Sequence, residues 1–154
     1  MRSTYRVLAF LIAALVAVQA AAIALWVFGL LNWVDEEKNS LTPQLADDRL
    51  EGVTGAVGIS IHSFGALAVA LVAIVLLIIS FFAKIPGGVK WALFVFLAVL
   101  VQWVVAIAAF GIPGLGAVHG ANAILIAWLA LRAARQANVV RGDATADPEV
   151  ATVS

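Results

Sequence analysis

Cysteine is absent from this 154-residue chain, and charged side chains are scarce. The lack of cysteine excludes disulfides, thiolate metal sites, iron–sulfur clusters and haem attached covalently through thioethers. Charged residues make up only 12% of the chain and cancel to a formal net charge of zero, whereas 64% of the residues are hydrophobic. Nucleic-acid binding has no support, because there is no basic patch. This composition is typical of an integral membrane protein rather than of a soluble domain.

Four long apolar runs provide the predicted membrane spans. They reach the roughly 18 residues needed to cross a bilayer, and they cover residues 7–31, 57–83, 89–110 and 115–131. Since the hydrocarbon core offers no water to exposed backbone groups, such runs form helices. Tight turns around Pro86 and Pro113 favour antiparallel neighbours. We therefore predict an all-α, integral membrane, four-helix up-down-up-down bundle that forms a single domain over residues 1–135, with the lipid bilayer as its surroundings.

The basic residues predict the orientation of these spans. Seven of the nine lysines and arginines fall on one side, and only Lys38 and Arg49 fall on the other. By the positive-inside rule both termini are cytoplasmic, in a multi-pass protein of the cell membrane. Arg2 and Arg6 before an apolar run also resemble the start of a signal peptide. The run continues to Leu31, long enough to span, so we expect an uncleaved first helix.

Two segments outside the spans carry most of the acidic residues. The external loop, residues 32–55, holds six acidic and two basic residues, a net charge of −4. Its carboxylates are scattered, which indicates a solvated face rather than a cation site. Residues 40–45 predict either a short interfacial helix, with Pro43 in its first turn, or a mobile loop. Residues 136–154 predict a disordered cytoplasmic tail.

The chain has two histidines, His62 and His119, and both fall inside predicted spans. An imidazole in hydrocarbon costs several kcal/mol unless it finds a partner. Each histidine lies about five residues past the outer end of a span that runs inward, which is ~8 Å below the boundary at ~1.5 Å per residue. The two spans are expected to be diagonal partners in the bundle. Matching depth on such helices suits two axial ligands that grip one haem iron.

Small and polar residues surround both histidines. A flat porphyrin needs small neighbours, although the same residues also serve close helix packing. Each histidine heads an alanine stripe at four-residue spacing, which is either an internal repeat or ordinary packing. Gln102 is a candidate partner for a ligating imidazole, Asn122 for a ring nitrogen, a propionate or a neighbouring helix, and Gln19 for an interhelical hydrogen bond. The candidate cofactor-binding residues are His62, His119, Gly58, Gly65, Ala66, Gln102, Gly116, Gly120, Asn122 and Ala123, and the two histidines are the candidate iron ligands.

Two stretches resemble a known family. Residues 58–66 are similar to the second helix of a half-unit of the haem A synthase family, and residues 102–123 are similar to its third and fourth helices. The resemblance implies haem b held between His62 and His119. The chain departs from the family in having no cysteine pair in its first outer loop, and in placing Ile59, not a glutamate, shortly before His62. It is also only half a synthase in length, so we do not expect a complete haem A synthase.

Three classes of function are compatible with these features. The first is a small b-type membrane cytochrome with haem b near the outer face, which exchanges electrons with quinol or a membrane oxidoreductase or handles haem. The second is a non-enzymatic accessory or scaffold protein, whose histidines hydrogen-bond across helices and whose acidic loop docks a partner. The third is a small transporter or channel formed by an oligomer, and a homo-oligomer fits the sequence. The absence of charged residues within the spans argues against a proton pump, voltage sensor or ion-coupled transporter.

Overall fold

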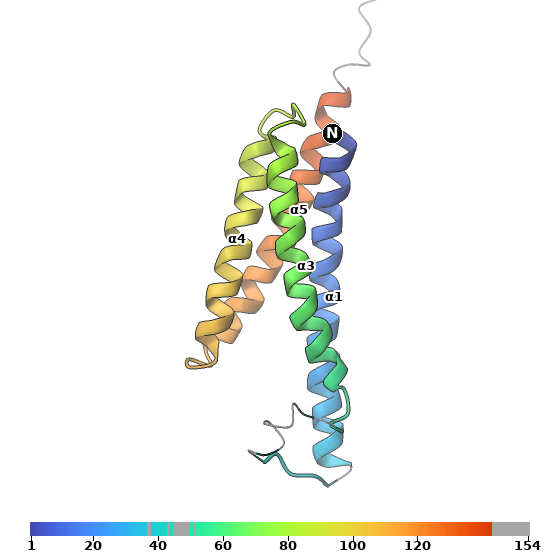
Figure 1. The fold of residues 1–154 in the computed structure, drawn as a ribbon, viewed down its shortest axis with the longest axis vertical. Helices are drawn as coiled ribbons and strands as arrows, with labels where there is room; N and C mark the ends of the chain where they lie inside the picture. The colour runs from blue at the N-terminus through green and yellow to red at the C-terminus, as the bar shows by residue number, and fades with distance from the viewer. Residues whose placement is uncertain (37, 43, 45–49, 51, 143–154) are drawn as a thin grey trace, which may run out of the picture. The chain divides into compact units, whose positions relative to one another are not determined.

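The computed structural model describes all residues except 37, 43, 45–49, 51 and 143–154. The described part contains four long helices (Figure 1), which are α1 (Arg2–Asp35), α3 (Ala56–Ser80), α4 (Gly88–Ala109) and α5 (Leu115–Gly142). Each contains a segment long and apolar enough to cross a membrane. The prediction of an all-α membrane protein with four spans is therefore confirmed.

The helices begin and end close to the predicted positions, with two exceptions. α1 is longer than the predicted span of residues 7–31, because its polar flanks continue the helix to Arg2 and Asp35. α4 begins after Gly87, whose φ of 71° is a left-handed conformation that glycine adopts without strain. The turn between α4 and α5 contains Pro113, which cannot continue the preceding helix.

The second exception corrects the predicted tail. Residues 136–142, expected to be disordered, continue α5 to Gly142. Ala137 is buried, and the Gln136 side chain donates a hydrogen bond from Nε2 to the carbonyl O of Pro86 at 2.9 Å. These contacts hold the polar end of the helix after the apolar run has ended. The rest of the predicted tail lies outside the described residues, as does most of the segment expected to form a short interfacial helix.

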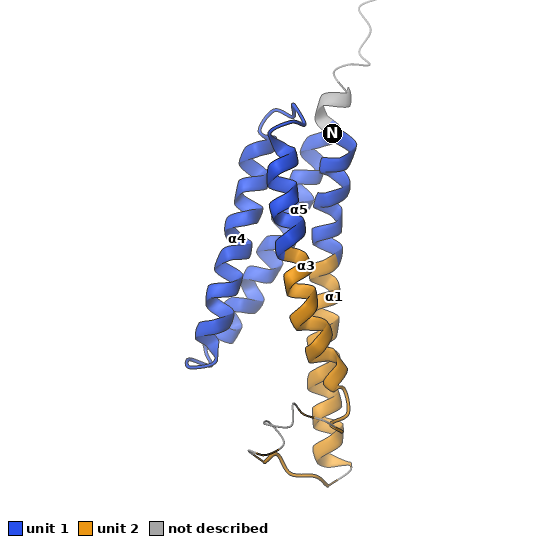
Figure 2. Cartoon of the chain, in the orientation of Figure 1, with its two compact units in different colours: residues 1–14, 70–154 blue, residues 15–69 orange. Residues whose placement is uncertain are grey.

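The chain divides into two compact units (Figure 2). Unit 1 comprises residues 1–14 and 70–154, and unit 2 comprises residues 15–69. α1 and α3 contribute to both units, whereas α4 and α5 belong to unit 1. Each unit has its own packing and its own histidine.

Unit 1 contains segments of all four helices, with α4 and α5 packed side by side as an antiparallel pair. Tyr5 and Ile12 of α1 are fully buried in its core. The Tyr5 hydroxyl donates a 2.8 Å hydrogen bond to the carbonyl O of Gly88 and so ties the start of α1 to the start of α4. The other large, fully buried side chains of this core are Leu76, Val95 and Ile126. The predicted bundle packing is thus present within unit 1.

Unit 2 is a hairpin of α1 and α3 that packs through glycine. A Cβ added at Gly58 would lie 2.8 Å from the backbone N of Trp26 and would also overlap the carbonyl O of Ala22. Gly29 meets the backbone of Thr54 in the same way. Because backbone atoms are in contact at these points, the two helices approach as closely as glycine allows, the usual device of membrane helices.

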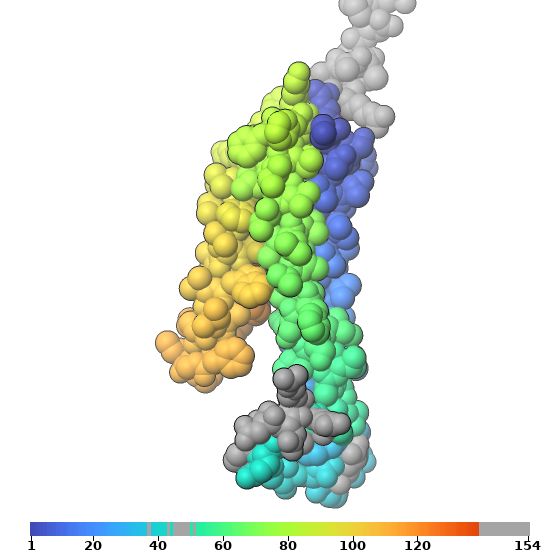
Figure 3. Space-filling model, in the orientation of Figure 1, coloured from blue at the N-terminus to red at the C-terminus, as the bar shows by residue number. Residues whose placement is uncertain are grey.

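The outer faces of the helices are apolar. Phe64 of α3 is 78% exposed, and Val104 and Ile107 of α4 are 67% and 69% exposed. Side chains of α3 and α4 cover the surface seen in Figure 3. A soluble protein would not expose so many large hydrophobic side chains on successive turns. Their contact with lipid acyl chains explains why the pattern is stable.

Gly58→Ala should lower the free energy of unfolding by about 1–3 kcal/mol, because neighbouring backbone atoms leave no room for a methyl group. The measurement is denaturant unfolding in mild detergent, followed by circular dichroism. Gly120→Ala is the matched control, since no heavy atom lies within 4 Å of a Cβ at that position of α5. It should leave stability unchanged or slightly higher, in line with helix propensity. Equal losses in both variants would contradict the glycine contact.

Candidate functional site

His119 of α5 is held by Gln102 of α4 through both of its ring nitrogens. Its Nε2 lies 3.0 Å from the Gln102 side-chain Nε2, and its Nδ1 lies 3.3 Å from the Gln102 carbonyl O. The amide N–H can only donate, so the imidazole Nε2 accepts and the ring proton is on Nδ1. Nδ1–H then donates to the carbonyl. Both bonds therefore require the same neutral tautomer, with the lone pair on Nε2.

Asn122 completes this polar network, which we call the Gln102–His119–Asn122 network. Its Nδ2 donates to the Gln102 side-chain Oε1 at 2.7 Å and to the backbone carbonyl O of Ala98 at 2.9 Å. The two N–H groups of Asn122 are thus both used. Asn122 bridges α5 to α4, one of the roles predicted for it. The expected contact between Gln102 and a histidine is present, whereas its service to an iron ligand stays a prediction.

His62 of α3 makes the same kind of backbone contact in unit 2. Its Nδ1 lies 3.3 Å from the carbonyl O of Gln19 in α1. The carbonyl accepts, so the proton is again on Nδ1 and the lone pair on Nε2. Each histidine therefore donates Nδ1–H to the backbone of a glutamine on the preceding membrane span. This parallel supports the internal repeat that the alanine stripes suggested.

The side chain of Gln19 differs from that of Gln102. It is only 9% exposed, and neither its Nε2 nor its Oε1 has a hydrogen-bond partner within the described part of the chain. Its amide lies against Gly65, directly where a Cβ would be. The predicted interhelical hydrogen bond from the Gln19 side chain is wrong, because Gly65 makes room for the amide and offers it no partner. The link between the helices comes instead from the Gln19 backbone.

The small candidate residues fall into two groups. Gly58 and Gly65 are in contact with α1, so each has a packing role in unit 2. Gly116 and Gly120 face open space, since no heavy atom lies within 4 Å of a Cβ at either position. Ala66 and Ala123 are half-buried, four residues after their histidines. The assignment of these six residues to a cofactor stays a prediction.

His62 belongs to unit 2 and His119 to unit 1. The structure brings Gln102, His119 and Asn122 together in one unit, and it brings His62, Gly58, Gly65 and Gln19 together in the other. Convergence of the two histidines on one haem stays a prediction. The sequence predictions missed Gln19 as the neighbour of a histidine. Gln19 follows Arg6 by 13 residues and His119 precedes Arg132 by 13, so counting from the basic inner boundary would have placed them at similar depth.

The described residues contain no group of three or more His, Cys, Asp or Glu side chains that could hold a metal ion. A metal ion bound by protein alone usually needs three or four such ligands. An iron carried by a macrocycle needs only axial ligands from the protein. The donor set near each histidine is therefore suited to an axial ligand and not to a bare metal ion.

Comparisons with known proteins add no family. No family model, no curated protein and no solved structure matches the chain. The resemblance to a haem A synthase half-unit therefore depends on the short stretches around His62 and His119 and stays a prediction.

Gln19→Leu should stabilise the protein, whereas Gln102→Leu should destabilise it. Leucine removes an amide that is buried without partners in the first case, a gain of about 1–3 kcal/mol. In the second case it strips His119 and Asn122 of their partner, with a loss of similar size. Denaturant unfolding of both variants in one detergent measures the difference. A loss of stability in both variants would show that the Gln19 amide has a partner after all.

Proposed function

We propose that this chain is a small b-type membrane cytochrome, in which His62 and His119 bind haem b through Nε2. The observation that carries the proposal is the matched contact of the two imidazoles. Each donates Nδ1–H to the carbonyl O of a glutamine, Gln19 or Gln102, at 3.3 Å. Metal-ligating histidines almost always donate their second ring N–H to such an acceptor. This bond fixes the tautomer, orients the ring and raises the basicity of Nε2.

The side chains of the two sites prepare different surroundings for a ligand. At His119, the Gln102 amide N–H occupies Nε2 and must swing away before that nitrogen can bind iron. Asn122 then keeps its bond to Ala98 and preserves the contact between α4 and α5. At His62, the Gln19 amide is buried without a partner and supports a polar group in its vicinity, because an unsatisfied amide gains free energy from any partner.

The protein around the histidines favours electron transfer. The apolar helices exclude water, and two imidazole ligands leave no coordination site for oxygen. When bound, haem b supplies a one-electron redox couple. A membrane location fits exchange with quinol or with a membrane oxidoreductase, which we propose as partners. A site that handles haem for delivery would use the same two histidines.

A second candidate function is favoured by one observation. Both ring nitrogens of His119 are already hydrogen-bonded to Gln102, so the imidazole ties α5 to α4 without any cofactor. In this case the chain is a non-enzymatic accessory protein, and its histidines serve stability. The acidic external loop would then dock a partner by charge.

The cytochrome proposal is tested by visible spectroscopy of protein purified in mild detergent from haem-supplied cells. We expect a sharp low-spin b-type spectrum on reduction. His62→Ala and His119→Ala should each remove the low-spin signal, because each deletes one axial ligand. Haem titration of the apoprotein should show affinity reduced by at least about tenfold in both variants, in the range known for damage to a metal site.

Ser63→Ala is the matched control. Ser63 is the neighbour of His62 in sequence, and its hydroxyl donates within its own helix to the carbonyl O of Ile59 at 2.9 Å. It should keep the full spectrum. Haem binding that survives both histidine variants, or no haem binding at all, would overturn the proposal. Histidine variants that bind no haem in either form, but unfold more easily, would favour the accessory protein.

A further inference from the structure

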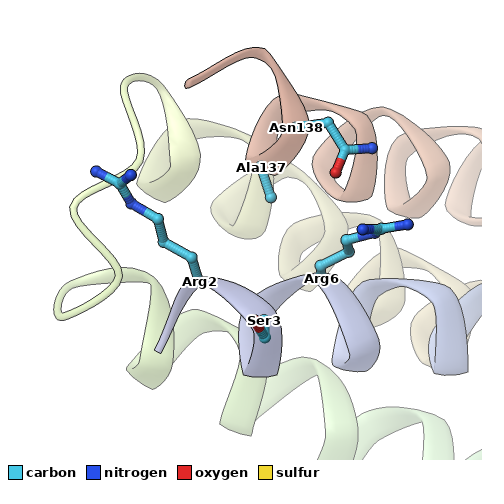
Figure 4. A pocket seen from close by; sticks show the side chains of 5 residues that line it. All are labelled: Arg2, Ser3, Arg6, Ala137 and Asn138. Atoms are coloured by element: carbon cyan, nitrogen blue, oxygen red, sulfur yellow. The ribbon is translucent and has the colours of Figure 1, made fainter. Parts of the chain in front are cut away.

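A pocket lies at the basic end of unit 1, between the first turns of α1 and the last turns of α5. It has a volume of about 220 Å³ and is lined by Arg2, Ser3 and Arg6 of α1 and by Ala137 and Asn138 of α5. Figure 4 shows Ser3 between the two arginines on α1, with Ala137 and Asn138 across from them. No part of the proposed haem chemistry uses these residues.

The pocket carries positive charge that the described protein does not neutralise. Among the described residues the one ion pair joins Asp35 and Lys38, so neither Arg2 nor Arg6 is paired with a carboxylate there. None of the five lining residues is acidic. The hydroxyl of Ser3 and the amide of Asn138 add neutral hydrogen-bonding groups. Such a set of groups recognises an anion with several acceptor oxygens, above all a phosphate.

Both guanidinium groups are held in place by weak contacts that leave donors available. Arg2 donates from Nη2 to the carbonyl O of Lys84 at 3.1 Å, which uses one of its five N–H groups. The Arg6 guanidinium lies 5.6 Å from the centre of the Phe10 ring, a cation–π contact that uses none of them. Arginines positioned in this way lose less side-chain entropy when an anion binds.

The location of the pocket identifies the source of the phosphate. The end of unit 1 where it lies carries seven lysines and arginines, which are Arg2, Arg6, Lys84, Lys90, Arg132, Arg135 and Arg141. Trp91 and Tyr5 mark the same level of the helices, where aromatic residues meet the headgroups of a bilayer. Anionic lipids are concentrated in the cytoplasmic leaflet, the side to which the basic residues are predicted to face. A headgroup phosphate is therefore the anion that reaches this pocket at high local concentration.

We propose that this pocket binds the phosphate headgroup of an anionic phospholipid. The acyl chains of that lipid would lie along the apolar surface of α1 below Arg6, where Phe10 is 42% exposed. The lipid would bridge α1 and α5 and so brace the inner end of unit 1.

The test uses delipidated full-length protein in detergent, titrated with phosphatidylglycerol or with phosphatidylcholine and followed by native mass spectrometry. We expect phosphatidylglycerol to bind at least fivefold more tightly. Arg2→Gln and Arg6→Gln should each weaken it by about fivefold, the effect of one basic residue at a lipid surface. Arg135→Gln is the matched control, since it removes the same charge from an exposed residue of α5 that does not line the pocket. It should change the affinity by less than twofold.

Two further arms separate the alternatives. Ala137→Leu fills the pocket without a change of charge and should weaken phosphatidylglycerol binding, with circular dichroism to confirm that the helices form. Arg6→Lys should retain part of the binding. Equal effects of Arg6→Gln and Arg135→Gln would overturn the proposal in favour of a general surface field. Equal binding of the two lipids, or full competition by 10 mM inorganic phosphate, would overturn it as well, the latter in favour of a site for free phosphate.

Discussion

A polar side chain inside hydrocarbon costs several kcal/mol unless it finds a hydrogen-bond partner, and this constraint governs the polar residues within the helices. In unit 1, Gln102, His119 and Asn122 satisfy one another and reach the α4 backbone at Ala98. The bonds involve two successive turns of α4, so they set the register of α5 against it. The environment of His119 and the geometry of the hairpin are therefore properties of the same few bonds.

The two hairpins share one contact and differ in the next. In both, the histidine Nδ1 donates to the carbonyl O of a glutamine on the preceding span. Three residues after His119 stands Asn122, which satisfies the glutamine amide, whereas three residues after His62 stands Gly65, which does not. A single difference in a repeated pattern thus separates a closed polar network from one with an unsatisfied amide. The close helix approach at Gly58 and Gly65 in unit 2 comes with that difference.

The sequence was sufficient for the fold class and the four spans, because apolar runs of this length have one stable structure in a bilayer. It also placed Gln102 near a histidine, since residues at equal distance from the membrane boundary meet in an antiparallel hairpin. It failed at Gln19, where the helix was counted from the ends of its apolar run and the backbone carbonyl was not considered as a partner. It failed again after residue 135, because composition alone does not register the hydrogen bond from Gln136 to Pro86 that holds the end of α5.

The two candidate functions use the same bonds at different stages. Without a ligand, His119 links α5 to α4 through both ring nitrogens, as an accessory protein would require. Release of its Nε2 from the Gln102 amide costs about 1 kcal/mol, the usual net value of one hydrogen bond, while the Nδ1 bond and the Asn122 bridge remain. A coordinate bond to iron readily exceeds that cost. A structural role for His119 in the empty protein is therefore compatible with ligation in the loaded one, and the hydrogen bonds that position the ring in the first state are those that orient a ligand in the second.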